Sequence, residues 1–342
     1  MKSLSDKAIE RLRAGADDPD LAGTRYRLLE RIARGGMGVV YSAEDEKLER
    51  RVALKVLDVP GAGGDLANRL MREARVLARL EHPGIVPVHD VGTLADGRVF
   101  YTMKFVEGQR LDKFIEGIES VQDRLRLFLR ICEAVAFAHA RGVLHRDLKP
   151  ANIMVGPFGE VLVMDWGLAK ILPGETPSAN RTIDPEATIL EIPKPLEKTN
   201  DSTKSSVITG HGTVMGTPGY MSPEQARGEV EVLDARSDIF SLGALLRFIL
   251  TQNTPTGSTP RLDRSLDAIC AKATAEQRGS RYSAVQELGQ DVSRYLDGLA
   301  VGAHRESIFE KTARFYRRYR FFILLILAYL AMRVILLLVL KR

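Results

Sequence analysis

The sequence is poor in cysteine, with only Cys132 and Cys270 among its 342 residues. Two cysteines exclude a disulfide framework and a zinc site built from cysteine ligands. Such scarcity is typical of proteins that fold in a reducing compartment. Both residues have apolar neighbours on expected helix faces, so we predict that they are ordinary core residues.

The body of the chain also lacks an excess of positive charge, although the whole chain carries a formal charge of +5. Residues 305–342 contain nine basic and two acidic side chains and so carry +7, which leaves residues 1–304 at −2. A nucleic-acid-binding domain normally has a basic face, so no nucleic-acid partner is expected. Residues 1–23 form a charged N-terminal extension without the apolar run of a signal peptide, and no export of the body is expected.

One long apolar run is present near the C-terminus. Residues 321–340 read FFILLILAYLAMRVILLLVL, with Arg333 as their single charge, and twenty such residues match the thickness of a bilayer. Their fifteen Phe, Ile, Leu and Val side chains favour insertion by roughly 4 to 9 kcal/mol. Arg333 opposes it by about 2.5 to 3.5 kcal/mol. A core helix is seldom apolar on every face, and an interfacial helix needs a polar face, so we predict a transmembrane helix at 321–340.

Charges beside this run predict its orientation. Six basic residues lie between 305 and 320, within an expected juxtamembrane segment at 300–320, and two follow the run. The positive-inside rule then places the body of the protein in the cytoplasm. The same basic residues are suited to anionic lipid. Whether two chains pair through the helix is left open.

The body divides into a β-rich part and a helical part. Strands are expected at 26–33, 39–43, 51–57, 86–90 and 99–103, with an amphipathic helix at 65–80. Further helices are expected at 121–141, 239–250, 266–275 and 284–299. Residues 173–212 are rich in Pro, Ser and Thr without periodicity, and are predicted to be a disordered insert. The pattern predicts an α+β protein with a small β-rich lobe and a larger helical lobe.

A glycine-rich turn follows the first expected strand, at residues 33–38 (ARGGMG). Glycines let backbone amides approach phosphate oxygens closely. A dinucleotide-binding loop would lead into a helix, whereas Val39 and Val40 continue as a strand, and the Gly-Lys-Ser/Thr of a Walker A loop is absent. The turn alone is equally compatible with an ordinary hairpin.

A lysine and a glutamate extend this pattern. Lys55 lies on the strand that follows the glycine-rich hairpin, where its ammonium can reach phosphates if an acid holds it. Glu73, on the helix expected at 65–80, is the candidate acid. Glu73 lies between basic residues, so a solvated surface position is the alternative interpretation.

Two motifs are the most specific in the chain: His-Arg-Asp-Leu-Lys-Pro-Ala-Asn at 145–152 and Met-Asp-Trp-Gly at 164–167. They resemble the catalytic and metal-binding motifs of protein kinases, specifically of bacterial membrane-anchored Ser/Thr kinases. The resemblance covers about residues 24–299. It implies a bilobal kinase fold with an N-lobe at 24–103 and a C-lobe at 104–299, anchored at the bacterial inner membrane.

The resemblance implies a role for each catalytic residue. Asp147 accepts or orients the proton of the substrate hydroxyl, and Lys149 neutralises charge on the transferred phosphoryl group. Asn152 and Asp165 hold magnesium or manganese, since amide and carboxylate oxygens suit hard cations. The Lys55–Glu73 pair faces the phosphates of ATP.

The resemblance also places residues around ATP. Val40 and Ala53 form the roof of the adenine site and Met154 its floor. Met103 is the gatekeeper, and backbone groups of Lys104 and Val106 face the base. The complete expected ATP-binding set is Ile32, Ala33, Gly35, Gly36, Gly38, Val40, Ala53, Lys55, Met103, Lys104, Val106 and Met154.

The segment after Asp165 is implied to regulate the site and to bind peptide. Arg146 is expected to pair with a phosphate on this segment, for which Thr209 and Thr213 are the preferred acceptors. Thr217 is expected to hydrogen-bond near Asp147 and Lys149, and it indicates Ser/Thr acceptors. Three further residues have expected structural roles: Glu224 and Arg281 as an ion pair, and Asp238 as a buttress of the catalytic loop.

Four departures from the family pattern concern activity. Ala33 replaces a glycine and would be strained if its φ were positive. Trp166 replaces phenylalanine and is expected to fill the same pocket. The segment between Asp165 and Glu224 is about twice the usual length, and residues 250–266 are too short for the usual substrate-docking region.

The sequence therefore predicts an ATP- and Mg²⁺-dependent kinase that phosphorylates Ser and Thr of proteins, itself included. The alternative is a pseudokinase, a membrane-tethered scaffold that binds nucleotide or a partner without phosphotransfer. The departures favour it, and the complete set of catalytic residues argues against it. A small-molecule kinase is disfavoured by residues 216–224, which resemble a peptide-binding segment.

Overall fold

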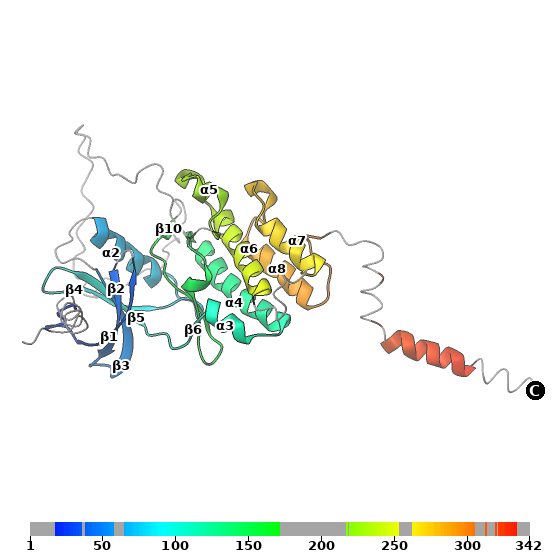
Figure 1. Ribbon diagram of the computed structural model, residues 1–342, viewed down its shortest axis with the longest axis horizontal. Helices are drawn as coiled ribbons and strands as arrows, with labels where there is room; N and C mark the ends of the chain where they lie inside the picture. Colours follow the sequence, from blue (N-terminus) through cyan, green and yellow to red (C-terminus); the bar gives the residue numbers. More distant parts are fainter. Residues whose placement is uncertain are drawn as a thin grey trace, which may run out of the picture.

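The computed structural model describes residues 18–35, 38–57, 65–171, 217, 219–252, 262–304, 312, 319 and 321–333. They form a β-rich N-lobe and a helical C-lobe (Figure 1). This is the two-lobed arrangement expected from the sequence. The expected insert at 173–212, and with it Thr209 and Thr213, lies outside the described residues.

The N-lobe is an antiparallel sheet with one described helix. Its strands are β1 (Tyr26–Gly35), β2 (Gly38–Asp45), β3 (Arg50–Val56), β4 (Val88–Thr93) and β5 (Val99–Lys104), in the order β1-β2-β3-β5-β4. Helix α2 (Asp65–Ala78) packs on β4 and β5. Its apolar side chains recur at helical spacing, so Leu70, Ala74 and Leu77 are buried while Arg72 and Arg75 are exposed.

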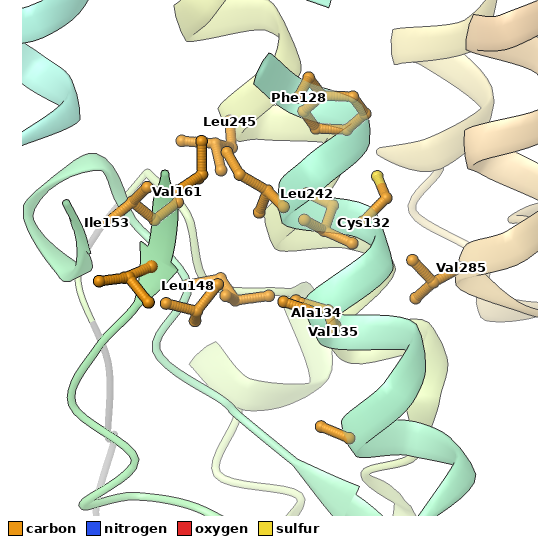
Figure 2. Close-up of a cluster of buried hydrophobic side chains, with 14 of the residues drawn as sticks. Phe128, Cys132, Ala134, Val135, Leu148, Ile153, Val161, Leu242, Leu245 and Val285 are labelled. Carbon is orange, nitrogen blue, oxygen red and sulfur yellow. The ribbon is translucent and has the colours of Figure 1, made fainter. Parts of the chain in front are cut away.

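The C-lobe is built on helix α4 (Val121–Ala140), which contacts α6 (Ala235–Thr251) and α8 (Val285–Leu296). Figure 2 shows Phe128, Cys132 and Val135 of α4 directed into the same cluster as Leu242 and Leu245 of α6. Cys132 and Cys270 are both buried and free, as expected of core residues. Helices α3 (Leu111–Phe114), α5 (Pro223–Ala226) and α7 (Arg264–Ala273) complete the described α-helices of this lobe.

Local signals explain where the central helix begins and ends. Ser120 precedes α4, and its hydroxyl accepts a hydrogen bond from the backbone amide of Asp123. Gly142 follows the helix with a φ of +70°, a conformation that glycine adopts at little cost. The helix expected at 121–141 is therefore present with nearly the predicted bounds.

Five short strands were not located by the apolar periodicity of the sequence. They are β6 (Gln109–Arg110), β7 (Val143–Leu144), β8 (Ile153–Val155), β9 (Val161–Val163) and β10 (Lys170–Ile171), paired in the orders β6-β8-β9 and β10-β7. Strands of two or three residues show no alternation from which they can be predicted. They matter for the site, because Asn152 immediately precedes β8 and Asp165 closely follows β9.

Residues 321–333 are helical. The remainder of the helix expected at 321–340 lies outside the described residues. In the part of the chain that the structure describes, no helix is both long enough and apolar enough to cross a membrane.

Candidate active site

A cavity of about 660 Å³ lies in the cleft between the two lobes. It is lined by every expected ATP-binding residue that the structure describes: Ile32, Ala33, Gly35, Gly38, Val40, Ala53, Lys55, Met103, Lys104, Val106 and Met154. Gly36 lies outside the described residues. Several lining residues were missed by the sequence analysis, among them Leu77, Tyr101, Gly108, Arg110 and Leu168.

The glycine-rich turn closes a hairpin over this cavity. β1 and β2 are antiparallel, with Gly35 opposite Gly38 and Ala33 opposite Val40. At Gly38, φ is +156°, and a Cβ would lie 2.2 Å from the carbonyl oxygen of Val56 on β3. Among the described residues of the turn, Gly38 is therefore the one at which only glycine fits without a steric clash.

The condition under which Ala33 would be strained, a positive φ, is not met in this geometry. Ala33 is not among the described residues with positive φ, because it lies within the extended pairing of β1 with β2. An extended backbone suits alanine as well as glycine. The substitution therefore has no backbone cost, and one argument for an inactive protein is removed.

Lys55 and Glu73 form a buried ion pair at the back of the cavity. The Lys55 ammonium lies 2.7 and 2.9 Å from the two carboxylate oxygens of Glu73. The Glu73 side chain is only 1% exposed, so the alternative of a solvated surface glutamate is wrong. Lys55 Nζ also lies 3.7 Å from Asp165 Oδ1. The lysine therefore lies between an acid of the N-lobe, Glu73, and an acid of the C-lobe, Asp165.

Asp147 is the centre of a polar cluster on the C-lobe side. Lys149 Nζ donates to Asp147 Oδ2 at 2.6 Å and to Thr217 Oγ1 at 2.8 Å. Thr217 Oγ1 in turn donates to Asp147 Oδ1 at 3.1 Å. Asn152 Nδ2 donates to the backbone oxygen of Asp147 at 2.8 Å and to Oδ2 at 3.1 Å. The expected contact of Thr217 with both catalytic residues is therefore present.

Asn152 and Asp165 meet the requirements for a magnesium ion. Both line the cavity from the open end of the hairpin formed by β8 and β9, where Asn152 precedes β8 and Asp165 follows β9. The amide nitrogen of Asn152 is committed to Asp147, and among the described residues no hydrogen bond uses its amide oxygen. The Asp165 side chain is half exposed. An amide oxygen and a carboxylate, supplemented by phosphate oxygens, form a donor set that magnesium accepts.

No larger cluster of metal ligands competes with this pair. Among the described residues, no group of three or more His, Cys, Asp or Glu side chains is placed to hold a metal ion. A site with two protein ligands depends on the nucleotide for the rest of its coordination. The geometry thus fits a metal that enters together with a phosphorylated substrate.

Asp238 buttresses the catalytic loop from helix α6. Its carboxylate accepts hydrogen bonds from the backbone amides of His145 and Arg146, each at 2.8 Å, and contacts His139 Nε2 at 2.8 Å. Burial alone would raise the pKa of Asp238, but its contacts with His139 and His145 outweigh burial and lower the pKa. The buried carboxylate stays ionised and holds the backbone that carries Asp147.

The catalytic loop and the metal-binding turn both contain unusual backbone. Arg146 has a φ of +68° and Asp165 a φ of +56°. Each such conformation costs about 1–3 kcal/mol in a residue other than glycine, and residues of this kind cluster at functional sites. Trp166 beside Asp165 is 1% exposed, and its ring centroid lies 4.6 Å from that of His145. The larger ring is therefore accommodated within the core.

Arg146 is placed as a candidate for phosphate binding. Burial lowers the pKa of its guanidinium, with Asp238 opposing that effect. Its Nε is buried, with no hydrogen-bond partner among the described residues. The expected acceptors Thr209 and Thr213 lie outside those residues, so their pairing with Arg146 stays a prediction.

Glu224 and Arg281 form a fully buried ion pair, as expected. The guanidinium binds the carboxylate through two contacts of 2.7 and 2.9 Å, and both side chains are 0% exposed. Ser237 Oγ donates to Glu224 as well. Burial opposes ionisation, but the hydrogen bonds that the carboxylate accepts, from Arg281 foremost and from Ser237 and the backbone, together outweigh it and lower the pKa of Glu224 to about 2. The pair ties α5 to the turn at Arg281 in the C-lobe.

Comparison with known proteins agrees with this geometry. The family model described as a protein kinase domain matches residues 26–299. The serine/threonine-protein kinase PknD of Protochlamydia amoebophila is 34% identical over 315 residues, which cover 80% of this chain and 30% of that protein. PknD of Chlamydia trachomatis is 37% identical over 309 residues, covering 80% and 32%. The chain thus spans about a third of the length of these curated relatives.

Solved structures agree with the fold. The crystal structure of the Mycobacterium tuberculosis PknI kinase domain is similar to this chain, with a TM-score of 0.54. The similarity covers 80% of this chain and 96% of that domain. The sequence identity is 22%, so this likeness concerns the fold alone.

Proposed function

Since this chain belongs to the protein kinase family, we propose that it transfers the γ-phosphoryl group of ATP to Ser and Thr hydroxyls of proteins. The observation that carries the proposal is the simultaneous presence of two assembled clusters. The Lys55–Glu73 pair is closed on the N-lobe side, and Asp147, Lys149, Asn152 and Thr217 are joined on the C-lobe side. In this family both halves must be in place for transfer.

The residues of the C-lobe cluster supply a base and a cation. Asp147 Oδ1 already accepts a hydrogen bond from one hydroxyl, that of Thr217, and is suited to orient an incoming Ser or Thr hydroxyl. As the new O–P bond forms, the bond between the γ-phosphorus and the bridging oxygen of ATP breaks and ADP leaves, while the substrate hydroxyl gives its proton to the Asp147 carboxylate. Lys149 lies beside the same carboxylate and is placed to offset negative charge on the phosphoryl group.

Lys55 performs the matching role for the remaining phosphates. Two of its three N–H donors point to Glu73, so the ammonium is fixed in direction before the nucleotide arrives. Asn152 and Asp165 would hold the magnesium. When bound, the metal would supply positive charge that offsets the charge of the phosphates and lowers the barrier to transfer.

The proposal is tested by incubating the full chain with γ-labelled ATP and magnesium and measuring label in the protein and in a generic Ser/Thr substrate. Asp147→Asn keeps the size of the side chain but removes the base, and we expect incorporation to fall by at least 100-fold. Asp267→Asn, an exposed aspartate of the same lobe, serves as the matched control. Equal label in wild type and Asp147→Asn would contradict the proposal.

Autophosphorylation between residues 199 and 213 is part of the proposal. The buried, unpartnered Nε of Arg146 supports it, because a phosphate on Thr209 or Thr213 would supply the missing acceptor. Phosphopeptide mapping of active protein is expected to find phosphate in this segment, and the Asp147→Asn protein is expected to carry none. Phosphate confined to other segments would refute it.

We also propose that residues 321–340 anchor the protein in the bacterial inner membrane, with the kinase domain in the cytoplasm. The apolar run and the basic residues that precede it support this location. A variant that ends at residue 304 is expected to leave the membrane fraction after cell lysis, while the full chain resists extraction at high pH. Release of the full chain by alkaline extraction would oppose the proposal.

A further inference from the structure

Tyr101 is a buried tyrosine in the wall of the nucleotide cavity. It lies on β5 directly opposite Lys55 on β3, so both side chains project from the same face of the sheet. Its ring is 1% exposed, and the Lys55 ammonium lies 5.8 Å from the ring centroid. Tyr101 is thus a neighbour of the buried ion pair and not only a core residue.

The hydroxyl of Tyr101 bonds to the acid of that pair. It donates to Glu73 Oε1 at 2.9 Å, beside the bond that Lys55 makes to the same oxygen. Burial raises the pKa of Tyr101 well above its ordinary value, and the negative charge of Glu73 adds to the effect. The phenol therefore keeps its proton and remains a donor.

Among the described residues, Lys55 and Tyr101 are the two side chains that donate to Glu73. A lysine has three N–H donors, and phosphates in the cavity compete for them. Lys55 must then divide its donors between Glu73 and the phosphates. The Tyr101 hydroxyl donates to Glu73 independently of Lys55, so the Glu73 carboxylate keeps this donor when Lys55 turns toward a nucleotide.

We propose that Tyr101 is a positioning residue of the phosphotransfer site, whose hydroxyl holds Glu73, and through it α2 and Lys55, in the orientation that faces the phosphates. The inference rests on the proposed kinase function. The hydrogen bond from Tyr101 on β5 to Glu73 then helps to hold α2 against the sheet, and this contact does not involve the segment that follows Asp165.

Tyr101→Phe removes the hydroxyl and keeps the ring that fills the core. We expect kcat to fall about tenfold, equivalent to about 1.4 kcal/mol, because a smaller fraction of molecules holds Lys55 in place. The KM for ATP is expected to stay within twofold, because the adenine-facing residues are unchanged. Loss of packing would instead raise KM and lower the melting temperature together.

The matched control is Tyr26→Phe. Tyr26 is also a buried tyrosine of the N-lobe, and its hydroxyl bonds to the Asp90 carboxylate at 2.9 Å, away from the cavity. It loses the same kind of bond, so similar melting temperatures are expected for the two variants. Only Tyr101→Phe is expected to lower kcat.

A double-mutant comparison and an activity-independent measurement complete the test. In a Glu73→Gln background, Tyr101→Phe is expected to change kcat by less than twofold, because Glu73→Gln already disrupts the positioning that the Tyr101–Glu73 hydrogen bond supports. Hydrogen–deuterium exchange of the full chain is expected to rise in α2 of Tyr101→Phe and to stay constant in α4.

The outcomes separate this inference from the proposed function. Unchanged kcat and unchanged α2 exchange in Tyr101→Phe would overturn the inference, as would a full tenfold further loss in the Glu73→Gln background. If the wild-type chain transfers no phosphate, the proposed function fails. Exchange in α2 then decides by itself whether Tyr101 positions Glu73.

Discussion

Replacing Arg281 by methionine is expected to destabilise the C-lobe by about 3–5 kcal/mol, because it leaves a buried carboxylate without its cation. Glu224 and Arg281 are both completely buried and share two short contacts. Without the guanidinium, Ser237 is the side chain among the described residues that still donates to the Glu224 carboxylate. The lowering of the Glu224 pKa from 4.5 to about 2 corresponds to a stabilisation of the ionised carboxylate by about 3 kcal/mol, to which Arg281 makes the largest favourable contribution.

Equilibrium unfolding in urea measures this loss. Trp166, the only tryptophan of the chain, is buried and reports unfolding by its fluorescence. The control is Arg247→Met, which breaks an ion pair of 3.1 Å with Asp267 whose side chains are about half exposed. Its expected cost is below about 1 kcal/mol. Equal costs for the two variants would refute the reasoning that burial makes the Glu224 pair valuable.

Acid should reduce the difference between wild type and Arg281→Met. The pKa of Glu224 is depressed in the folded protein, so its stabilisation is complete above about pH 4.5 and is lost as the pH falls toward 2. Below that range the carboxyl is protonated and Arg281 has no anion to bind. Because burial without Arg281 raises the pKa of Glu224 in the variant, the gap in unfolding free energy is expected to be largest near neutral pH and to shrink as the pH falls toward 2. A gap that grows on acidification would contradict this assignment.

Two further substitutions test the site and its support. Gly38→Ala places a Cβ 2.2 Å from the Val56 carbonyl oxygen, so we expect a lower melting temperature and a KM for ATP raised by about tenfold. Gly35→Ala is the control: its Cβ would have its nearest neighbour at 3.8 Å, and the melting temperature should stay within about one degree of wild type. The two carboxylate oxygens of Asp238 each accept a hydrogen bond from a backbone amide, whereas Asn at this position has one acceptor oxygen and an NH2 group that donates. Because Asp238→Asn thus leaves one backbone amide unpaired, kcat should fall by about tenfold or more in a kinetic assay while nucleotide affinity changes little. Wild-type values for either variant would show that these contacts are not needed.

Much of the fold followed from patterns in the sequence. The strands of the N-lobe and the helices α4, α6, α7 and α8 are long enough for their apolar periodicity to be distinct, and they lie within a few residues of their expected bounds. The strands β6 to β10 were missed because two or three residues carry no period. The expected strand at 86–90 instead occupies Val88–Thr93, since its polar residues mask the alternation.

Residues of the site were predictable to the extent that their motifs are local. Asp147, Lys149 and Asn152 lie within six residues, and their cluster is present in the structure. Tyr101 was missed because its partner Glu73 is 28 positions away, and neither residue has a local signal of the contact.

Hydrogen bonds between residues far apart in the sequence could not be predicted for the same reason. Arg124 of α4 is buried and donates to the carbonyl oxygens of Ile249 and Gln252 at the end of α6, which lie 125 and 128 positions away. Its function is to satisfy carbonyl groups that the end of a helix leaves unpaired. Only the fold brings these groups together.

Parallel measurement of nucleotide binding and phosphate transfer on one preparation of the full chain tests the central claim most directly. With ATP and magnesium, the account predicts that wild type binds nucleotide and becomes labelled, and that Asp147→Asn binds nucleotide with similar affinity but is not labelled. Binding by wild type without transfer, with magnesium or with manganese, would contradict the account and establish the chain as a nucleotide-binding scaffold.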